Sequence, residues 1–203
     1  MSSEALPRPG YSRVLAALRN RTALRGTMVI AVAALAAFAF AAKAEALGTN
    51  IVPNPSFERL CCWLDGDPAG PDSISRVPSG YNGIAAHAGS YFERVRTEQH
   101  IVGAVDTGIV SKAFPVAEVQ YRYSAWIHAP VGTTIRVGID FFASNGSLQE
   151  RAVHFTPGTG AWQHVTFDVS APLNPATAQV FAYQGKTAEA ITFYTDLFTL
   201  RPL

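Results

Sequence analysis

"YRYSAWIHAPVGTTIRVGIDFF", from Tyr121 to Phe142, is the stretch that decides the fold class. Apolar and polar residues alternate in its first half, and they alternate again after the loop residues "APVGT". Successive side chains of a strand point to opposite faces, so the apolar positions of the first half share one face. These positions are Tyr121, Tyr123, Ala125 and Ile127. Two β-strands that each bury one face are therefore expected here.

The same pattern continues to the end of the chain. The alternating runs are "WQHVTFDVSA", "AQVFAYQG" and "ITFYTDLFTL", and turn-forming residues separate them. "SNGS", from Ser144 to Ser147, predicts a tight hairpin, because Asn-Gly tolerates the positive φ angles of a type I′ turn. We find no convincing amphipathic helix after Ala46. The pattern predicts an all-β domain, either an antiparallel sandwich or a barrel.

The first 44 residues have the features of an export signal. Five arginines precede an unbroken apolar run from Met28 to Ala42, and the small-residue words "AKA" and "AEA" follow it. Such a run rises about 22 Å as a helix, which is short of the roughly 30 Å hydrocarbon core. Residues 1–44 are therefore expected to form a cleaved signal peptide, with an uncleaved anchor helix as the alternative. Both place residues 45–203 outside the cytoplasm, as a secreted or cell-surface domain.

The charge balance excludes one class of partner. The whole chain has a formal net charge of +1, and residues 1–44 carry +5, so residues 45–203 carry −4. A mildly acidic domain is a poor binder of nucleic acid, which needs clustered positive charge. Contact with a membrane is expected only through an uncleaved N-terminal segment. Residues 45–203 are enough for one domain with its own core.

Several words of the sequence, in order, resemble the carbohydrate-binding modules of families 4, 9 and 22. "NIVPNPSFE" followed by a Trp resembles their opening, and "HAGSYFERVRT" resembles an early strand. The stretch from Tyr121 to Phe142 is similar to their "YxxSaWV" hairpin, and "FYTDLFTL" is similar to their last strand. The resemblance covers Asn50 to Leu200. It implies a galactose-binding-like jelly roll, a two-sheet antiparallel sandwich with adjacent first and last strands. It also implies an exported, non-catalytic domain that binds a polysaccharide or cell-wall glycan.

The resemblance assigns three ligand-binding residues, namely Arg96, Trp126 and Gln184. Sugar binding uses flat aromatic rings and planar hydrogen-bonding groups, and these residue types supply both. Gln184 replaces a Glu of the family, which puts xylan specificity in doubt. The polar neighbours of Trp126 agree with a ligand face, whereas packing under a loop is the alternative. Arg96 has the alternative of a solvated strand end, and Tyr183 is expected to pack in the core.

The resemblance also assigns a structural calcium ion to Glu58 and Asp196. Calcium prefers oxygen ligands, and carboxylates from the two ends of the chain would link the first and last strands. Leu197 stands where the family has a second Asp. The alternative is a hydrogen-bonded or solvated pair of carboxylates.

Signatures of catalysis are scarce in this sequence. It contains no "HExxH" or "GxSxG", and its histidines are dispersed. "DTG" at Asp106 is a single triplet, while an aspartic protease needs two such carboxylates. Two rival hypotheses remain beside the binding module. One is a surface-assembly protein without a sugar site, and the other is a small glycan hydrolase or lyase. Such an enzyme needs two carboxyl groups, and the sequence offers only Glu93, near Arg96, with no second carboxylate that can be named as its partner.

Cys61 and Cys62 are the only two cysteines of the chain, and they are adjacent. The cell exterior favours oxidation, and two thiols alone make a poor zinc site. Neighbouring Cα atoms lie about 3.8 Å apart, less than the usual separation in a disulfide. We therefore expect buried or free thiols ahead of a vicinal disulfide, with an intermolecular bridge third.

Overall fold

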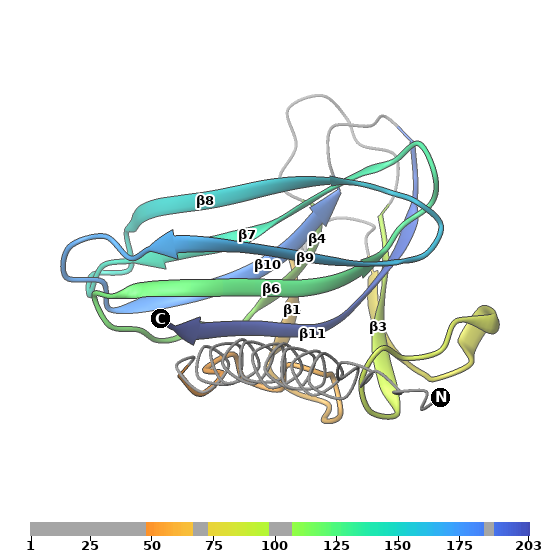
Figure 1. The fold of residues 1–203 in the computed structure, drawn as a ribbon, viewed down its shortest axis with the longest axis horizontal. Helices are drawn as coiled ribbons and strands as arrows, with labels where there is room; N and C mark the ends of the chain where they lie inside the picture. Colours follow the sequence, from red (N-terminus) through yellow and green to blue (C-terminus); the bar gives the residue numbers. More distant parts are fainter. Residues whose placement is uncertain (1–47, 67–72, 98–106, 185–188) are drawn as a thin grey trace, which may run out of the picture. The chain divides into compact units, whose positions relative to one another are not determined.

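The computed structural model (Figure 1) describes residues 48–66, 73–97, 107–184 and 189–203. The expected signal or anchor segment and Asp106 lie outside these residues. Within the described ranges, no helix is long and apolar enough to cross a membrane.

Two antiparallel sheets pack against each other around one main apolar core (Figure 1). The six-stranded sheet has the order β1 (Trp63–Asp65), β4 (Gly108–Ser111), β10 (Thr177–Gln184), β7 (Thr134–Phe142) and β8 (Leu148–Pro157), with β5 (Phe114–Pro115) also paired to β10. The five-stranded sheet has the order β2 (Ser73–Pro78), β3 (Tyr91–Arg96), β11 (Thr192–Pro202), β6 (Gln120–His128) and β9 (Trp162–Ser170). One short 3-10 helix, η1 (Tyr81–Gly83), lies between β2 and β3. The predicted all-β class and two-sheet sandwich are confirmed.

Strand β6 shows the predicted alternation. Its inward side chains are almost fully buried, and they are Tyr121, Tyr123, Ala125 and Ile127. The expected hairpin of β6 with β7 is wrong, because β6 pairs with β11 and β9 while β7 pairs with β10 and β8. Both strands have one fully apolar face, so they lie on opposite sides of the core. The loop "APVGT" carries the chain from one sheet to the other.

The "SNGS" hairpin joins β7 to β8 as predicted. Its turn is different, because Gly146 has a φ of 80° whereas Asn145 does not have a positive φ. The amide of Gly146 donates to the carbonyl of Ala143, and the side chain of Asn145 accepts from the amide of Ser147. This is a type I turn followed by a left-handed glycine, in place of type I′.

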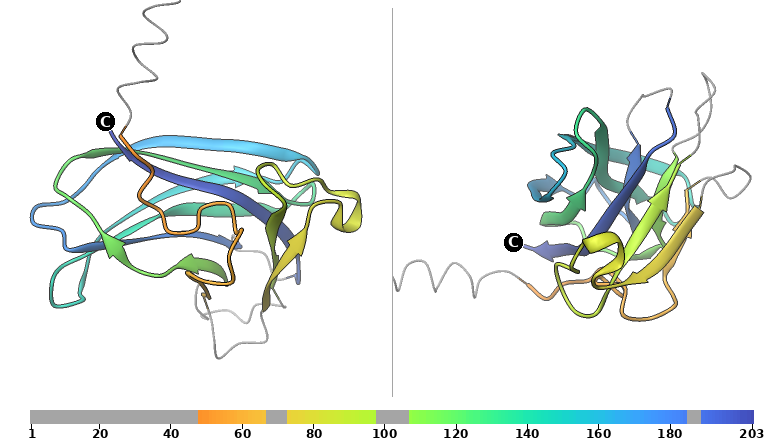
Figure 2. Two further views of the ribbon diagram at one scale, coloured as in Figure 1. Left: turned by 90° about the horizontal axis from the view of Figure 1, so that it is seen from below. Right: turned by 90° about the vertical axis from the view of Figure 1, so that its right-hand side faces the viewer.

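The first described residues run beside β11, the last strand (Figure 2, left). The side chain of Asn50 donates to the carbonyl of Phe198 and accepts from the amide of Leu200. The amide of Phe198 in turn donates to the carbonyl of Pro55. The two ends of the domain therefore lie side by side. The predicted adjacency of the first and last strands is wrong, however, because this first segment is not a strand and β1 belongs to the other sheet from β11.

Candidate functional site

Trp126 lies on the outer face of the five-stranded sheet, as the alternation predicts. Its indole stacks with the imidazoles of His87 and His164, at centroid distances of 3.5 Å and 4.8 Å. His87 belongs to the loop before β3, and Asp196 holds this loop by accepting a hydrogen bond of 2.8 Å from the amide of Ala88. The indole therefore packs against this loop, which agrees with the alternative, and its ligand role stays a prediction.

The side chains of Gln184 and Arg96 face different environments, the interior and the solvent respectively. Gln184 is buried on the inner face of β10, where it accepts a hydrogen bond from the hydroxyl of Thr97 and donates to the carbonyl of Glu189. Arg96 is exposed on β3, and β11 separates that strand from β6 and Trp126. The structure therefore does not gather Arg96, Trp126 and Gln184 in one groove.

These positions change the expected effect of Trp126→Ala. We expect a loss of about 1–3 kcal/mol of stability, because the loop loses its stacking partner, and unchanged glycan affinity. Thermal unfolding and glycan binding measured on the same variant check this, with Arg96→Ala as a surface control. Lost binding with an unchanged melting temperature would return Trp126 to the binding site.

The outer face of the six-stranded sheet carries a different set of side chains. Phe181 and Tyr183 of β10 stack with centroids 4.5 Å apart. The guanidinium of Arg151 lies 5.3 Å from the Phe181 ring centre, and that of Arg136 lies 6.0 Å from the Tyr183 ring centre. Tyr183 is nearly buried, but it packs under arginines and not in the core, because its neighbours Ala182 and Gln184 face inward. The expectation for Tyr183 is wrong in this respect.

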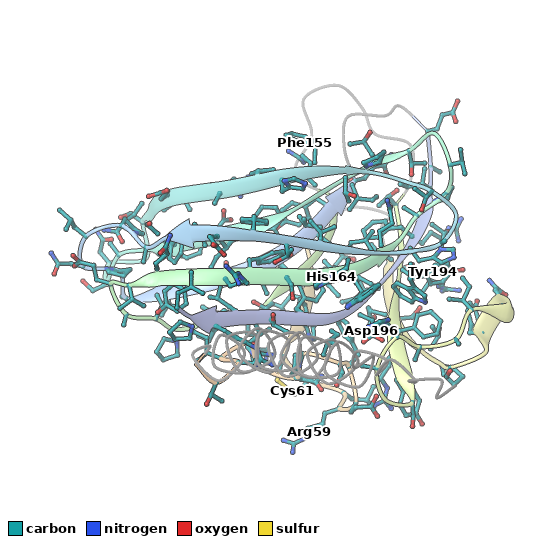
Figure 3. The ribbon with its side chains drawn as sticks, viewed as in Figure 1. Arg59, Cys61, Phe155, His164, Tyr194 and Asp196 are labelled. Atoms are coloured by element: carbon teal, nitrogen blue, oxygen red, sulfur yellow. A yellow bond between two sulfur atoms is a disulfide. The ribbon has the colours of Figure 1, made fainter. Side chains whose placement is uncertain are left out.

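A charged pair and an exposed aromatic ring complete this surface. Arg151 donates two hydrogen bonds, of 2.7 and 2.8 Å, to the carboxylate of the buried Asp140. Phe155 stands opposite Arg136 in the β7–β8 register and is 60% exposed. Figure 3 shows Phe155 projecting from β8. We call this surface the aromatic–arginine face, and its members are Arg136, Asp140, Arg151, Phe155, Phe181 and Tyr183.

The aromatic–arginine face has the chemistry that binding a sugar requires. The exposed ring can stack on the apolar face of a pyranose, and fixed guanidinium groups can donate to its hydroxyls. The sequence of β7 does indicate part of this surface, because its alternation places Arg136, Gly138 and Asp140 on one face of the strand. A Cβ at Gly138 would collide with the Phe181 ring, so the glycine lets this ring lie across the neighbouring strand.

Glu58 and Asp196 both bind the loop before β3. One oxygen of Glu58 accepts from the amides of Ser90 and Tyr91, at 2.8 and 3.1 Å. Burial raises the pKa of Asp196 to about 6, against backbone hydrogen bonds that lower it, and the nearby charge of Glu58 raises it further. A cation bound between the two carboxylates would offset the repulsion between their negative charges. The second oxygen of Glu58 accepts no hydrogen bond from the described residues. Among those residues there is no cluster of three or more His, Cys, Asp or Glu, so backbone carbonyls would have to complete a calcium site.

Cys61 and Cys62 form a vicinal disulfide, so the expectation of free or buried thiols is wrong. Cys62 adopts a φ of 79°, a left-handed conformation that an extended strand would not allow. Asn54 holds the loop by donating from its side chain to the carbonyls of Arg59 and Cys61. The bond forms although the two Cα atoms lie only 3.7 Å apart, and the segment that contains it is a tight loop.

Comparisons with known proteins bear on the fold. No protein-family model and no curated protein matches the sequence. Among solved structures, the enzymatically active domain of bacteriophage CBA120 tailspike protein 4 is similar, with a TM-score of 0.56, 13% identity, and coverage of 76% of this chain and 21% of that chain. This chain therefore spans only about a fifth of the tailspike chain.

Smaller proteins match over nearly their whole length. The C-terminal family 22 carbohydrate-binding module of Clostridium thermocellum Xyn10B has a TM-score of 0.54 and 18% identity, with 75% of this chain and 93% of that chain covered. TmCBM61, solved with β-1,4-galactotriose, has a TM-score of 0.51 and 18% identity, with 77% and 100% covered. The described part of this chain therefore has the β-sandwich fold of the carbohydrate-binding modules.

Proposed function

We propose that the domain is an exported, non-catalytic module that binds a polysaccharide or cell-wall glycan through the aromatic–arginine face. The observation that carries the proposal is the exposed ring of Phe155 in register with Arg136, beside the Arg151–Asp140 pair. Similar structures that match over nearly their whole length are carbohydrate-binding modules.

Affinity electrophoresis in gels that contain soluble glycans tests this proposal. A binding module is retarded by at least one glycan and releases no reducing ends. A glycan array then identifies the sugar. Release of reducing ends would support the hydrolase or lyase hypothesis, which the partial match to the tailspike enzymatic domain also motivates.

We also propose that Glu58 and Asp196 hold a structural calcium ion between the loop before β3 and β11. The raised pKa of Asp196 and the uncommitted oxygen of Glu58 support it. Calcium would then stabilise the native state, because it binds that state alone. Its role would be structural, since both carboxylates lie on the five-stranded side, away from the aromatic–arginine face.

We expect calcium to raise the melting temperature of the protein, and excess chelator to lower it. A calcium concentration 100-fold above the dissociation constant adds about 2.7 kcal/mol of stability. Differential scanning fluorimetry measures the shift, and Glu58→Gln should abolish it. Identical melting curves in calcium and in chelator would remove the site.

A further inference from the structure

A pocket lies at the side of the sandwich where both sheets end. It has a volume of about 300 Å³, and its lining comes from the loop before β1, from β1 and β2, which are edge strands, and from β3. Figure 3 shows Arg59 and Cys61 of this loop on the lower side of the domain, whereas Phe155 lies at its upper side. The pocket is therefore separate from the aromatic–arginine face.

One wall of the pocket is apolar, whereas Arg59, Ser75 and Arg76 add polar groups to the lining. Cys61 and Trp63 line it, and Leu60 stands in its lining with 84% of its surface exposed. The disulfide to Cys62 closes a small ring with the peptide bond between the two residues, which restricts the backbone there. The indole of Trp63 is oriented by a hydrogen bond of 3.0 Å to the carbonyl of Asn54. Trp63 and the disulfide therefore form a rigid apolar surface that a flat ligand can contact.

A carboxyl group with unused hydrogen-bonding capacity lies in the lining. Glu93 is 5% exposed, and its carboxyl makes no hydrogen bond to the described residues. The neighbouring strands do not supply a partner. Thr195 faces it from β11 with a buried hydroxyl that is itself without a partner, and Arg76 faces it from β2 but donates to the carbonyl of Glu58 and lies 4.1 Å over the ring of Tyr91.

The environment keeps this carboxyl neutral. Burial raises the pKa of Glu93 to about 8, although the positive charges of Arg76 and Arg94 lower it. A protonated carboxyl both donates and accepts a hydrogen bond. Buried polar groups are normally paired, so an unpaired one that lines a cavity indicates a ligand or water partner.

We propose that this pocket binds a single neutral pyranose ring, the terminal sugar of a glycan chain. Trp63, Leu60 and the disulfide would contact the apolar face of the ring, and Glu93 would exchange hydrogen bonds with one hydroxyl. Ligand pockets span about 300–1,000 Å³, so this one suits one ring and not an oligosaccharide. The ligand class rests on the proposed function, whereas the pocket itself rests on the geometry above.

Titration of the full-length protein with methyl pyranosides tests the pocket. The probes are the methyl glycosides of glucose, galactose, mannose and xylose, followed by saturation-transfer NMR and tryptophan fluorescence. We expect at least one to bind with a millimolar dissociation constant. Leu60→Arg, a substitution at an exposed position, should weaken binding at least ten-fold, whereas the matched control Val131→Arg, at a position 78% exposed outside this pocket, should not.

Two further variants separate this inference from the proposed function. Glu93→Gln keeps a donor and an acceptor and should retain binding, whereas Glu93→Leu should lose it. If polysaccharide binds but no methyl pyranoside does, the pocket is overturned and the proposed function stands. If pyranoside binding survives Leu60→Arg and disappears in Phe155→Ala, the sugar binds the aromatic–arginine face and the pocket proposal is wrong. If the pocket binds pyranosides and Phe155→Ala leaves polysaccharide binding intact, the proposed face is wrong.

Discussion

Glu93→Gln should stabilise the protein by a few kcal/mol at pH 9 and have little effect at pH 5. The free energy of unfolding of the wild type should fall as pH rises between these values, and that of the variant should fall much less. The reason is the burial that raises the pKa of Glu93 to about 8. Each unit of difference between the folded and unfolded pKa corresponds to about 1.4 kcal/mol.

The direction follows from proton linkage. Above the ordinary pKa of 4.5, the unfolded state loses its proton while the folded state keeps it until about pH 8. The folded state binds more protons in this window, so stability decreases with rising pH and levels off above it. Neutral Gln at this position does not titrate, and the corresponding loss disappears.

Urea denaturation at pH 6.5 and at pH 9 isolates Glu93. Asp196, with its pKa of about 6, has largely titrated by the lower of these values, and the pKa of His87 is lowered by burial and by His164. Both groups therefore contribute little to the change within this window. Equal pH dependence in the wild type and in Glu93→Gln would contradict the assignment of the neutral carboxyl.

Phe155→Ala should lower glycan affinity ten-fold or more without lowering the melting temperature. Its ring is 60% exposed, so its loss leaves no cavity, and the lost contact is worth about 1–3 kcal/mol. Isothermal titration with the glycan that the array identifies measures the change. Leu173→Ala, which removes another exposed apolar side chain from the loop after β9, is the matched control.

Arg136→Ala should weaken binding as well, because Arg136 stands opposite Phe155 in the β7–β8 register and its guanidinium lies 6.0 Å from the Tyr183 ring centre. Arg151 is less suitable for this test, since removing it leaves the buried carboxylate of Asp140 without its bidentate partner. If Phe155→Ala and Leu173→Ala bind equally well, the aromatic–arginine face is not the binding surface.

The alternation of apolar and polar residues was enough to predict the strands and their buried faces. It placed Tyr121 and Ile127 inward and Trp126 outward, because the period of a strand fixes faces without knowledge of pairing. It did not fix which strands pair, and so β6 and β7 were expected in one hairpin. Two consecutive strands that each have one apolar face can pair in one sheet or lie in opposite sheets across the core. The alternation is the same in both cases, so it does not decide the pairing.

The site was harder to predict for a related reason. Side chains on one strand face share a surface only if the neighbouring strands are known. Trp126 and Gln184 were taken from family positions, but Trp126 is covered by imidazoles and Gln184 faces the core. Phe181 and Arg151 share a surface only because β10, β7 and β8 pair side by side, which the sequence does not show.

The vicinal disulfide escaped prediction because of local backbone geometry. The expectation of free or buried thiols rested on the short separation of neighbouring Cα atoms. The φ of 79° at Cys62 and the hydrogen bonds of Asn54 show a folded loop. No periodicity in the sequence reports such a conformation.

Affinity electrophoresis of the wild-type protein against a panel of soluble polysaccharides tests the central proposal most directly. We expect retardation in at least one glycan gel, weaker retardation of Phe155→Ala in the same gel, and no release of reducing ends. Equal mobility in all glycan gels and in the glycan-free gel, for a protein whose melting curve shows it to be folded, would contradict it.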